Sequence, residues 1–333
     1  SDLLPMKMTY GAIQGSDRLR DAICTMYAKQ TRENIVVTHG AIGANALVHE
    51  TLVEPGDHVI SVRPTYQQHY SIPESYGADV DILQLRPENG FLPNLAELKA
   101  MVRPETKLIV LNNPNNPTGA LMEAEALDAF VAIARSCDAF VLCDEVYRGT
   151  NQIGDGFAPA MADVYEKGIS VAGMSKTFSL AGLRLGWIAA PLDVLEAVSI
   201  HRDYNTISVG MLDDYFAAMA LETKDKILAR SQQITRGNLA ILDAWVADEP
   251  SMSYVKPKAG TTALLKYDFD MPSRDFCIQL LQQTGVMFTP GSVMHMEGWL
   301  RVGYANDPEI LRTGLAKVSG FLAGLAANSG SAA

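Results

Sequence analysis

The chain has 333 residues, 48% of them hydrophobic and 20% charged, so it can bury a large core and is long enough for two domains. Its 27 basic and 38 acidic residues give a net charge of −11 with no basic stripe, which argues against a nucleic-acid-binding surface. The four cysteines form no CxxC pair, the six histidines do not cluster at metal-ligand spacing, and no run is long enough for a membrane span. We therefore expect a cytoplasmic protein without a metal site or a membrane anchor.

Short apolar runs alternate with helical patterns over the first two thirds of the chain. Apolar residues recur at helical spacing from Leu19 to Tyr27, and Ser16 or Asp17 can serve as the N-cap. The strands are apolar throughout rather than alternating, which is typical of a parallel sheet covered by helices on both faces. We expect strands at 34–38, 58–62, 79–85, 107–111, 139–143, 167–172 and 185–189, with a helix ending near 52 and helices at 70–76, 94–101 and 123–135.

The pattern changes towards the C-terminus. Pro191 opens a long helical region, and residues 212–246 carry apolar residues at helical spacing. From about residue 251 we expect a smaller α+β domain, with strands at 254–256, 263–267, 286–288 and 300–304 and helices near 274–284 and 308–325. The sequence thus predicts an α/β fold with a mostly parallel seven-stranded sheet in a large domain over residues 9–210. An interdomain helix and a small C-terminal domain would occupy residues 211–328.

Small or polar residues directly follow two of these strands, where ligands bind in open α/β sheets. Residues 40–44, Gly-Ala-Ile-Gly-Ala, join a strand to a helix, so their backbone N–H groups could approach a phosphate. A tight packed turn is the alternative, and the stretch does not match a Walker P-loop. Asn116 lies in a rigid turn between two prolines, where its amide can either donate to a phenolate oxygen or carboxylate or hold the turn together.

Four further residues carry charge or a hydroxyl group in apolar surroundings. Asp144 ends a strand, where a partly desolvated carboxylate needs a cationic partner such as a protonated ring nitrogen, and Tyr147 follows it closely. Helix capping is the alternative for Asp144. Arg184 and Arg301 can bind a carboxylate or phosphate through paired hydrogen bonds, or form internal salt bridges.

Lys176 lies between two apolar runs, at residues 169–174 and 185–189. Buried or half-buried lysines suit Schiff-base chemistry, whereas a solvated surface lysine is the simpler interpretation of Lys176 taken alone.

Taken in this order, these residues resemble the fold-type I, class I and II aminotransferases, which use pyridoxal phosphate (PLP). The resemblance covers nearly the whole chain and implies that residues 9–210 form the PLP-binding domain. Its most specific stretches are NNPNNPTG at 112–119, DEVY at 144–147 and MSKTFSLAGLRLGW at 174–187.

The resemblance implies a role for each residue. Lys176 would form a Schiff base with PLP and move the proton between the substrate Cα and the cofactor C4′. Asp144 would pair with the protonated pyridine nitrogen, and Asn116 and Tyr147 would bond the phenolate oxygen. Arg301 would bind the substrate α-carboxylate, and Asn116 is expected to contact the substrate as well. The catalytic residues are thus expected to be Lys176, Asp144 and Tyr147.

The resemblance also implies how the rest of the cofactor is held. Tyr66 would stack on the ring face. A tyrosine from the neighbouring subunit reaches the phosphate in this family, so the chain is expected to form a homodimer with shared active sites. The phosphate site would comprise Tyr10 of that neighbour together with Gly40, Ala41, Ile42, Ser175 and Arg184.

Two positions depart from the family pattern. Gly173 stands where a phosphate-binding serine or threonine is usual, so one hydroxyl contact is missing. Ile42 stands where a lysine or a hydroxyl residue is often found, which makes aspartate or glutamate a less favoured amino donor. The chain also starts just before Tyr10, whereas the family usually has an N-terminal arm that covers the substrate. The substrate side chain therefore stays open.

Three functions follow as hypotheses. The first is an aminotransferase that moves an amino group from an L-amino acid to a 2-oxo acid. The second is a PLP-dependent lyase or cyclase that uses the same residues, because stretches 85–91, 202–208 and 260–263 are similar to capreomycidine synthase. The third is a non-catalytic PLP-binding sensor domain. The net charge of −11 disfavours it, and no helix-turn-helix segment precedes Tyr10.

Overall fold

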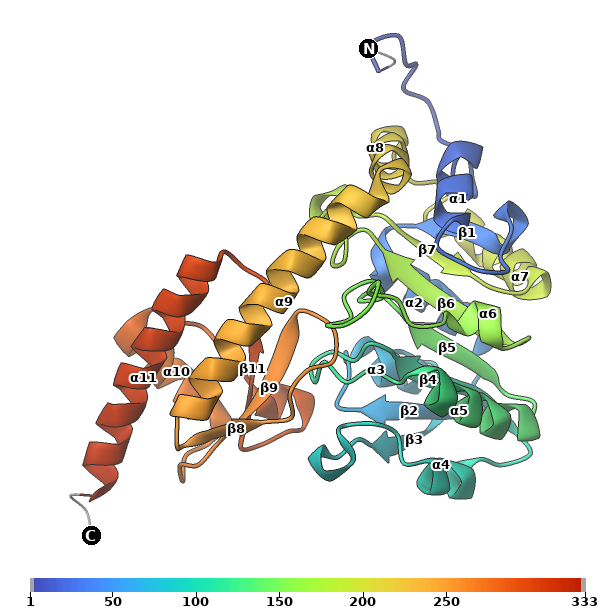
Figure 1. The fold of residues 1–333 in the computed structure, drawn as a ribbon. Coiled ribbons are helices and arrows are strands. Elements are labelled where there is room, and N and C mark those ends of the chain that lie inside the picture. The colour runs from blue at the N-terminus through green and yellow to red at the C-terminus, as the bar shows by residue number, and fades with distance from the viewer. Residues whose placement is uncertain (1–2, 331–333) are drawn as a thin grey trace.

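The computed structural model describes residues 3–330, which fold around two separate β-sheets (Figure 1). The larger sheet has seven strands in the order β1-β7-β6-β5-β4-β2-β3. This confirms the expected α/β fold and places each of the seven expected strands within one or two residues. They are β1 (Ile35–Thr38), β2 (His58–Arg63), β3 (Asp79–Gln84), β4 (Thr106–Asn112), β5 (Phe140–Asp144), β6 (Gly168–Gly173) and β7 (Gly186–Ala189).

Strand β7 is the exception in a sheet that is otherwise parallel. It pairs antiparallel with both β6 and β1, whereas β2 to β6 pair parallel to one another. The connection from β6 to β7, residues 174–185, contains a single 3₁₀ turn, η3 (Ala181–Leu183). A parallel neighbour needs a long crossover, usually a helix, so this short connection returns the chain in the opposite direction.

Helices cover both faces of the large sheet, which explains why its strands are apolar throughout. In β4, Leu108 and Val110 face one core while Ile109 and Leu111 face the other, because successive side chains of a strand point to opposite faces. Helices α2 and α7 pack on the first core, and α4 and α5 on the second. The helices of this part are α1 (Asp17–Cys24), α2 (Gly40–Leu52), α3 (Gln68–Ser75), α4 (Leu95–Met101), α5 (Ala124–Ser136), α6 (Met161–Val164) and α7 (Leu192–Asp203), with 3₁₀ turns η1 (Arg32–Asn34) and η2 (Pro87–Asn89).

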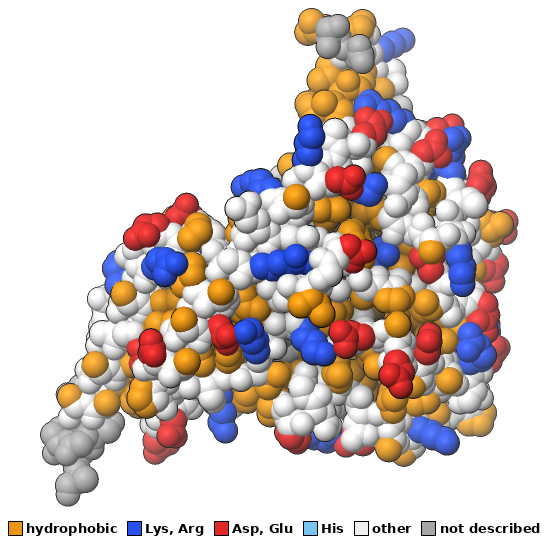
Figure 2. All heavy atoms as spheres, in the orientation of Figure 1, with side chains coloured by type: hydrophobic (Ala, Val, Ile, Leu, Met, Phe, Trp, Pro, Cys, Tyr) orange, Lys and Arg blue, Asp and Glu red, His pale blue; other side chains and the backbone are white. Residues whose placement is uncertain are grey.

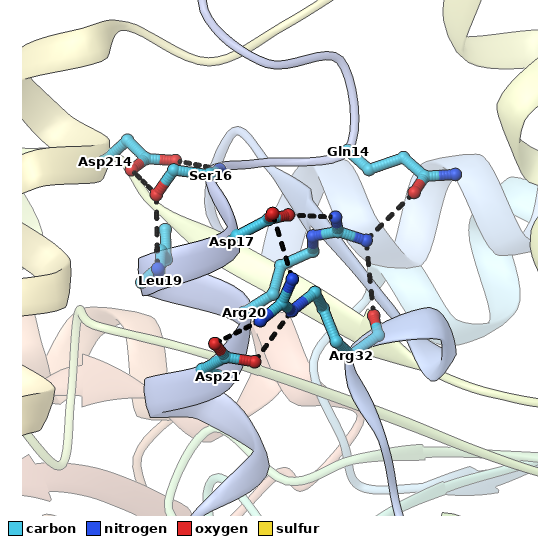
Figure 3. Close-up of polar contacts among 8 residues, drawn as sticks. All are labelled: Gln14, Ser16, Asp17, Leu19, Arg20, Asp21, Arg32 and Asp214. Carbon is cyan, nitrogen blue, oxygen red and sulfur yellow. Dashed lines mark hydrogen bonds and ion pairs between the residues drawn. The ribbon is translucent and has the colours of Figure 1, made fainter.

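Ser16 is the N-cap of α1 and joins that helix to α8 (Met211–Glu222), as Figure 3 shows. Its hydroxyl oxygen accepts a hydrogen bond from the Leu19 N–H at 3.1 Å. Its own backbone N–H and hydroxyl both donate to the Asp214 carboxylate of α8. A single residue therefore satisfies one backbone N–H of the first turn of α1 and fixes α8 beside it.

A long helix, α9 (Lys224–Asp248), runs from the large sheet to the smaller one (Figure 1). The smaller sheet is antiparallel, with the strand order β10-β11-β9-β8. Leu228 of α9 packs in the core beside the large sheet, and Leu239 and Leu242 pack in the core of the smaller one. The expected division at residue 210 stays a prediction. The remaining elements are β8 (Met252–Tyr254), β9 (Thr262–Tyr267), α10 (Ser273–Thr284), β10 (Thr289–Pro290), η4 (Gly291–Met294), β11 (Trp299–Gly303) and α11 (Pro308–Gly330).

Two expectations for this part of the chain were wrong. The strand expected at 286–288 forms later, at 289–290, because α10 ends at Gly285 in a left-handed conformation (φ 74°) and Met287 is 78% exposed. We also expected no run long enough for a membrane span, but residues 308–327 of α11 meet that criterion by length and composition. The apolar face of α11 packs on the smaller sheet, through Leu311, Leu315, Val318, Phe321 and Leu322.

Candidate active site

A cavity of about 390 Å³ lies at the carboxyl ends of β4, β5 and β6, beside the first turn of α2. It is closed on one side by β11 of the smaller sheet, so residues far apart in the sequence meet there. Tyr10 is not among its lining residues: it is 83% exposed on the N-terminal segment, which extends away from the body of the protein (Figure 1). The predicted residues that line the cavity are Ala41, Ile42, Tyr66, Asn116, Asp144, Tyr147, Ser175, Lys176, Arg184 and Arg301.

Lys176 lies on the connection between β6 and β7. Its side chain is exposed to the cavity rather than half-buried, although Met174 before it and Phe178 after it are both buried in the core. The next residue, Thr177, is buried, and its hydroxyl lies within hydrogen-bonding distance of the carbonyl oxygens of Val146 (3.1 Å) and Arg148 (2.9 Å). Thr177 thereby ties the lysine loop to the segment that follows β5, which brings Lys176 and Asp144 to the same cavity.

Asp144 is 5% exposed and is held by donors on both carboxylate oxygens. The Val146 N–H donates to Oδ1 at 3.0 Å, so Asp144 does cap its own turn. Asn45 Nδ2 donates to Oδ2 at 2.9 Å, and His69 Nε2 lies 3.4 Å from the same oxygen. A buried carboxylate with donors on both oxygens is fixed in orientation and can accept from a further donor in the cavity.

Asn45 and His69 were not recognised in the sequence, nor was their neighbour Gln68, which also lines the cavity. The sequence carried only a weak signal that these residues belong to the site. Asn45 is a polar residue inside an apolar helical stretch, and His69 follows Tyr66 by three residues. His49, one turn after Asn45 on α2, is fully buried, and desolvation together with the charge of His69 lowers its pKa to about 3. His49 is therefore neutral at physiological pH.

Tyr147 and Arg301 also line the cavity. Tyr147 is 3% exposed, and burial raises its pKa to about 12 against the opposing effect of a hydrogen bond with Thr261, so its hydroxyl stays protonated and can donate. Arg301 Nη1 donates to Asn116 Oδ1 at 3.4 Å, and Nη2 donates to Thr289 Oγ1 at 3.2 Å. These contacts orient the guanidinium and leave further donors for a carboxylate.

The first turn of α2 packs directly on β6 and β7 at two glycines that are paired across the strands. A Cβ atom at Gly186 would lie 2.4 Å from Ala41 N, and one at Gly173 would lie 3.0 Å from Leu185 O. A serine or threonine at position 173 would therefore press on this backbone, which would have to give by a few tenths of an ångström.

Arg184 completes this end of the cavity beside Gly40. A Cβ atom on Gly40, which has φ 67°, would lie 3.0 Å from Arg184 Nη2. Arg184 Nη1 donates to the Ala181 carbonyl oxygen at 2.9 Å and lies 3.5 Å from Ser175 Oγ. A helix N-terminus next to a guanidinium is a site for a phosphate dianion.

Residues 5–318 match the family described as aminotransferase class I and II. The chain belongs to that family. It is 30% identical to capreomycidine synthase from Streptomyces vinaceus, over 93% of this chain and 79% of that protein. It is 27% identical to aspartate/prephenate aminotransferase from Thermus thermophilus, over 95% and 84%. A PLP-dependent aminotransferase from Streptococcus suis has a similar structure, with a TM-score of 0.94 and 45% identity over 97% of this chain and 86% of that one.

These comparisons confirm the fold-type I assignment, and pyridoxal phosphate is the cofactor. The residues present fit it. The α2 N-terminus and Arg184 suit the phosphate, Asp144 suits a protonated ring nitrogen, and Tyr147 can donate to a phenolate oxygen. Asn45 Oδ1, buried at the wall of the cavity, has no hydrogen-bond partner among the described residues, which is consistent with a polar occupant.

Proposed function

We propose that the protein is an aminotransferase that moves the amino group of an L-amino acid to a 2-oxo acid. The observation that carries this proposal is that Lys176, Asp144 and Arg301 line a single cavity although they come from different parts of the chain. A primary amine, a buried carboxylate and an oriented guanidinium are the groups that PLP chemistry on an α-amino acid requires.

Bound PLP supplies an electron sink for the bond that breaks at the substrate Cα. Lys176 Nζ would hold the cofactor covalently and would carry a proton to and from the substrate Cα. Asp144 would accept from the ring N–H, and Tyr147 and Asn116 would donate to the phenolate oxygen. Arg301 binds the substrate α-carboxylate from the side of the smaller sheet.

The proposal includes a homodimer with shared active sites, in the cytoplasm. The homodimer is supported by the exposed apolar surface of the N-terminal segment. Figure 2 shows this surface as hydrophobic side chains on the part that extends from the body. Leu4 is 93% exposed and Met8 is 61% exposed on this segment, which also carries Tyr10. A partner that covers these residues would bring Tyr10 to the phosphate end of the neighbouring cavity.

One comparison favours a second candidate function, a PLP-dependent lyase or cyclase. The 30% identity to capreomycidine synthase spans 93% of this chain. Such an enzyme would use the same Lys176, Asp144 and Arg301. It would not deposit the amino group on the cofactor, so it would need no 2-oxo acid to complete its cycle.

The deciding experiment supplies the PLP-loaded protein with single L-amino acids and no 2-oxo acid. An aminotransferase bleaches the PLP absorbance and releases one 2-oxo acid per active site, then stops. A lyase or cyclase restores the absorbance and continues to form product. A sensor domain would bind PLP and turn over no amino acid.

Lys176→Ala tests the central residue, with Lys226→Ala, an exposed lysine of α9, as the matched control. We expect Lys176→Ala to lose at least about a thousandfold in turnover, because both the covalent link and the proton carrier are removed. The control should keep normal turnover. Full activity in Lys176→Ala would refute the proposed function.

A further inference from the structure

Helix α2 reaches both ends of the cavity from one face. Its first turn, at Gly40 and Ala41, lies beside Arg184 at the phosphate end, and Asn45 lies beside Asp144. Ala41 and Asn45 are four residues apart, so their side chains project from the same face of the helix, separated by about 6 Å along its axis. The same rigid element therefore contacts the phosphate site and the carboxylate that faces the ring nitrogen.

The side-chain amide of Asn45 has one orientation that its neighbours allow. Asn45 is 1% exposed, and its Nδ2 donates to Asp144 Oδ2 at 2.9 Å and to Gln68 Oε1 at 3.3 Å. The reverse orientation would place the amide oxygen against both acceptors. Gln68 is itself fixed, since its Nε2 donates to the carbonyl oxygen of Ile42 at 2.7 Å.

The two oxygens of Asp144 are held in different ways. Oδ1 accepts from the backbone N–H of Val146, two residues along the same turn. Oδ2 accepts from the side-chain amide of Asn45 on α2; His69 Nε2 of α3 lies 3.4 Å away but makes no hydrogen bond to it. An amide is a neutral donor at every working pH. Asn45 is thus the constant donor to Oδ2.

We propose that Asn45 is a positioning residue for the PLP chemistry, acting through Asp144. Its amide holds Oδ2 as the acceptor for the cofactor's ring N–H, from the helix whose N-terminus would hold the phosphate. This inference rests on the role proposed for Asp144.

Two substitutions of Asn45 separate this role from simple packing. Asn45→Leu removes the donor at similar volume, and the dissociation constant for PLP should rise about tenfold at every pH, which corresponds to about 1.4 kcal/mol. Asn45→Asp keeps the shape but places a second carboxyl group against Asp144. Two carboxyl groups at that distance share one proton at lower pH, and the loss of this proton at higher pH leaves two negative charges that repel each other.

The signature is the pH dependence of PLP binding relative to the natural protein. For each variant we take the ratio of its dissociation constant for PLP to that of the natural protein. This ratio should grow between pH 6 and pH 8.5 for Asn45→Asp and stay constant for Asn45→Leu. Absorbance titration with PLP gives both values, and circular dichroism without PLP shows that each variant is folded. Thr51→Val is the matched control on α2, since Thr51 bonds the Leu47 carbonyl oxygen and does not line the cavity.

Three outcomes would overturn the inference. Asn45→Leu could bind PLP within twofold of the natural protein, both variants could be weakened equally at every pH, or Thr51→Val could be weakened as much as they are. If Asn45→Leu does not fold, the pH dependence of Asn45→Asp alone decides. Because the measurement is PLP affinity and not turnover, it remains decisive even if the protein transfers no amino group, so the two proposals fail separately.

Discussion

Glu145, which follows Asp144 in the sequence, is a buried acid whose protonation should control stability near neutral pH. It is 2% exposed. Its Oε1 accepts from the Met161 N–H at 2.6 Å and from the Ser170 hydroxyl at 2.8 Å, whereas Oε2 has no hydrogen-bond partner among the described residues. Burial raises the pKa of Glu145 to about 7, against the opposing charge of Arg148. We predict that Glu145→Gln makes the protein more stable at alkaline pH.

The sign and the size of the effect follow from linkage. Because the folded-state pKa lies above the usual value of 4.5, the stability that Glu145 contributes is fully present below pH 4.5 and is lost as the pH rises through 7. At about 1.4 kcal/mol per pH unit, the full loss is roughly 3 kcal/mol. The part of this loss that falls between pH 6 and pH 8.5 is about 1.4 kcal/mol. This range lies above the isoelectric point of about 5.0, where the protein is least soluble. Glutamine keeps the oxygen that Met161 and Ser170 need, and it does not titrate.

The assay is urea unfolding at fixed protein and PLP concentrations, followed by tryptophan fluorescence. The difference in unfolding free energy between Glu145→Gln and the natural protein should increase by about 1.4 kcal/mol from pH 6 to pH 8.5. Glu105→Gln, an exposed position, is the control and should show a constant difference. Parallel pH profiles for Glu145→Gln and the natural protein would show that Glu145 does not titrate in this range.

Two further predictions concern the cavity. Gly173→Ser, which introduces the residue type usual in the family, should weaken PLP binding about tenfold or more, because its Cβ would lie 3.0 Å from Leu185 O. Tighter binding in an absorbance titration would contradict this. Arg301→Lys should raise the KM for the amino acid about 10- to 100-fold while PLP affinity stays the same, because an ammonium cannot bind the carboxylate through two parallel bonds. Steady-state kinetics checks this, and an unchanged KM would show that Arg301 does not bind the substrate carboxylate.

Much of this protein can be predicted from its sequence, because the relevant signals are local. Strands buried on both faces must be apolar along their whole length, so the seven strands of the large sheet were located within one or two residues. Lys176 and Asn116 stand in turns that follow strands and Asp144 ends a strand, and these places carry recognisable residue patterns. Their order along the chain was sufficient to indicate the family.

The tertiary structure alone decided which side chains surround these residues. Asn45 donates to Asp144 across 99 residues of sequence. The spacing of apolar residues within either element does not predict that α2 lies against the end of β5. The antiparallel direction of β7 and the close approach of Gly186 to Ala41 likewise depend on how the chain returns to the sheet. Local patterns report which face of an element is buried, whereas the partner on that face is set by packing between elements that are distant in sequence.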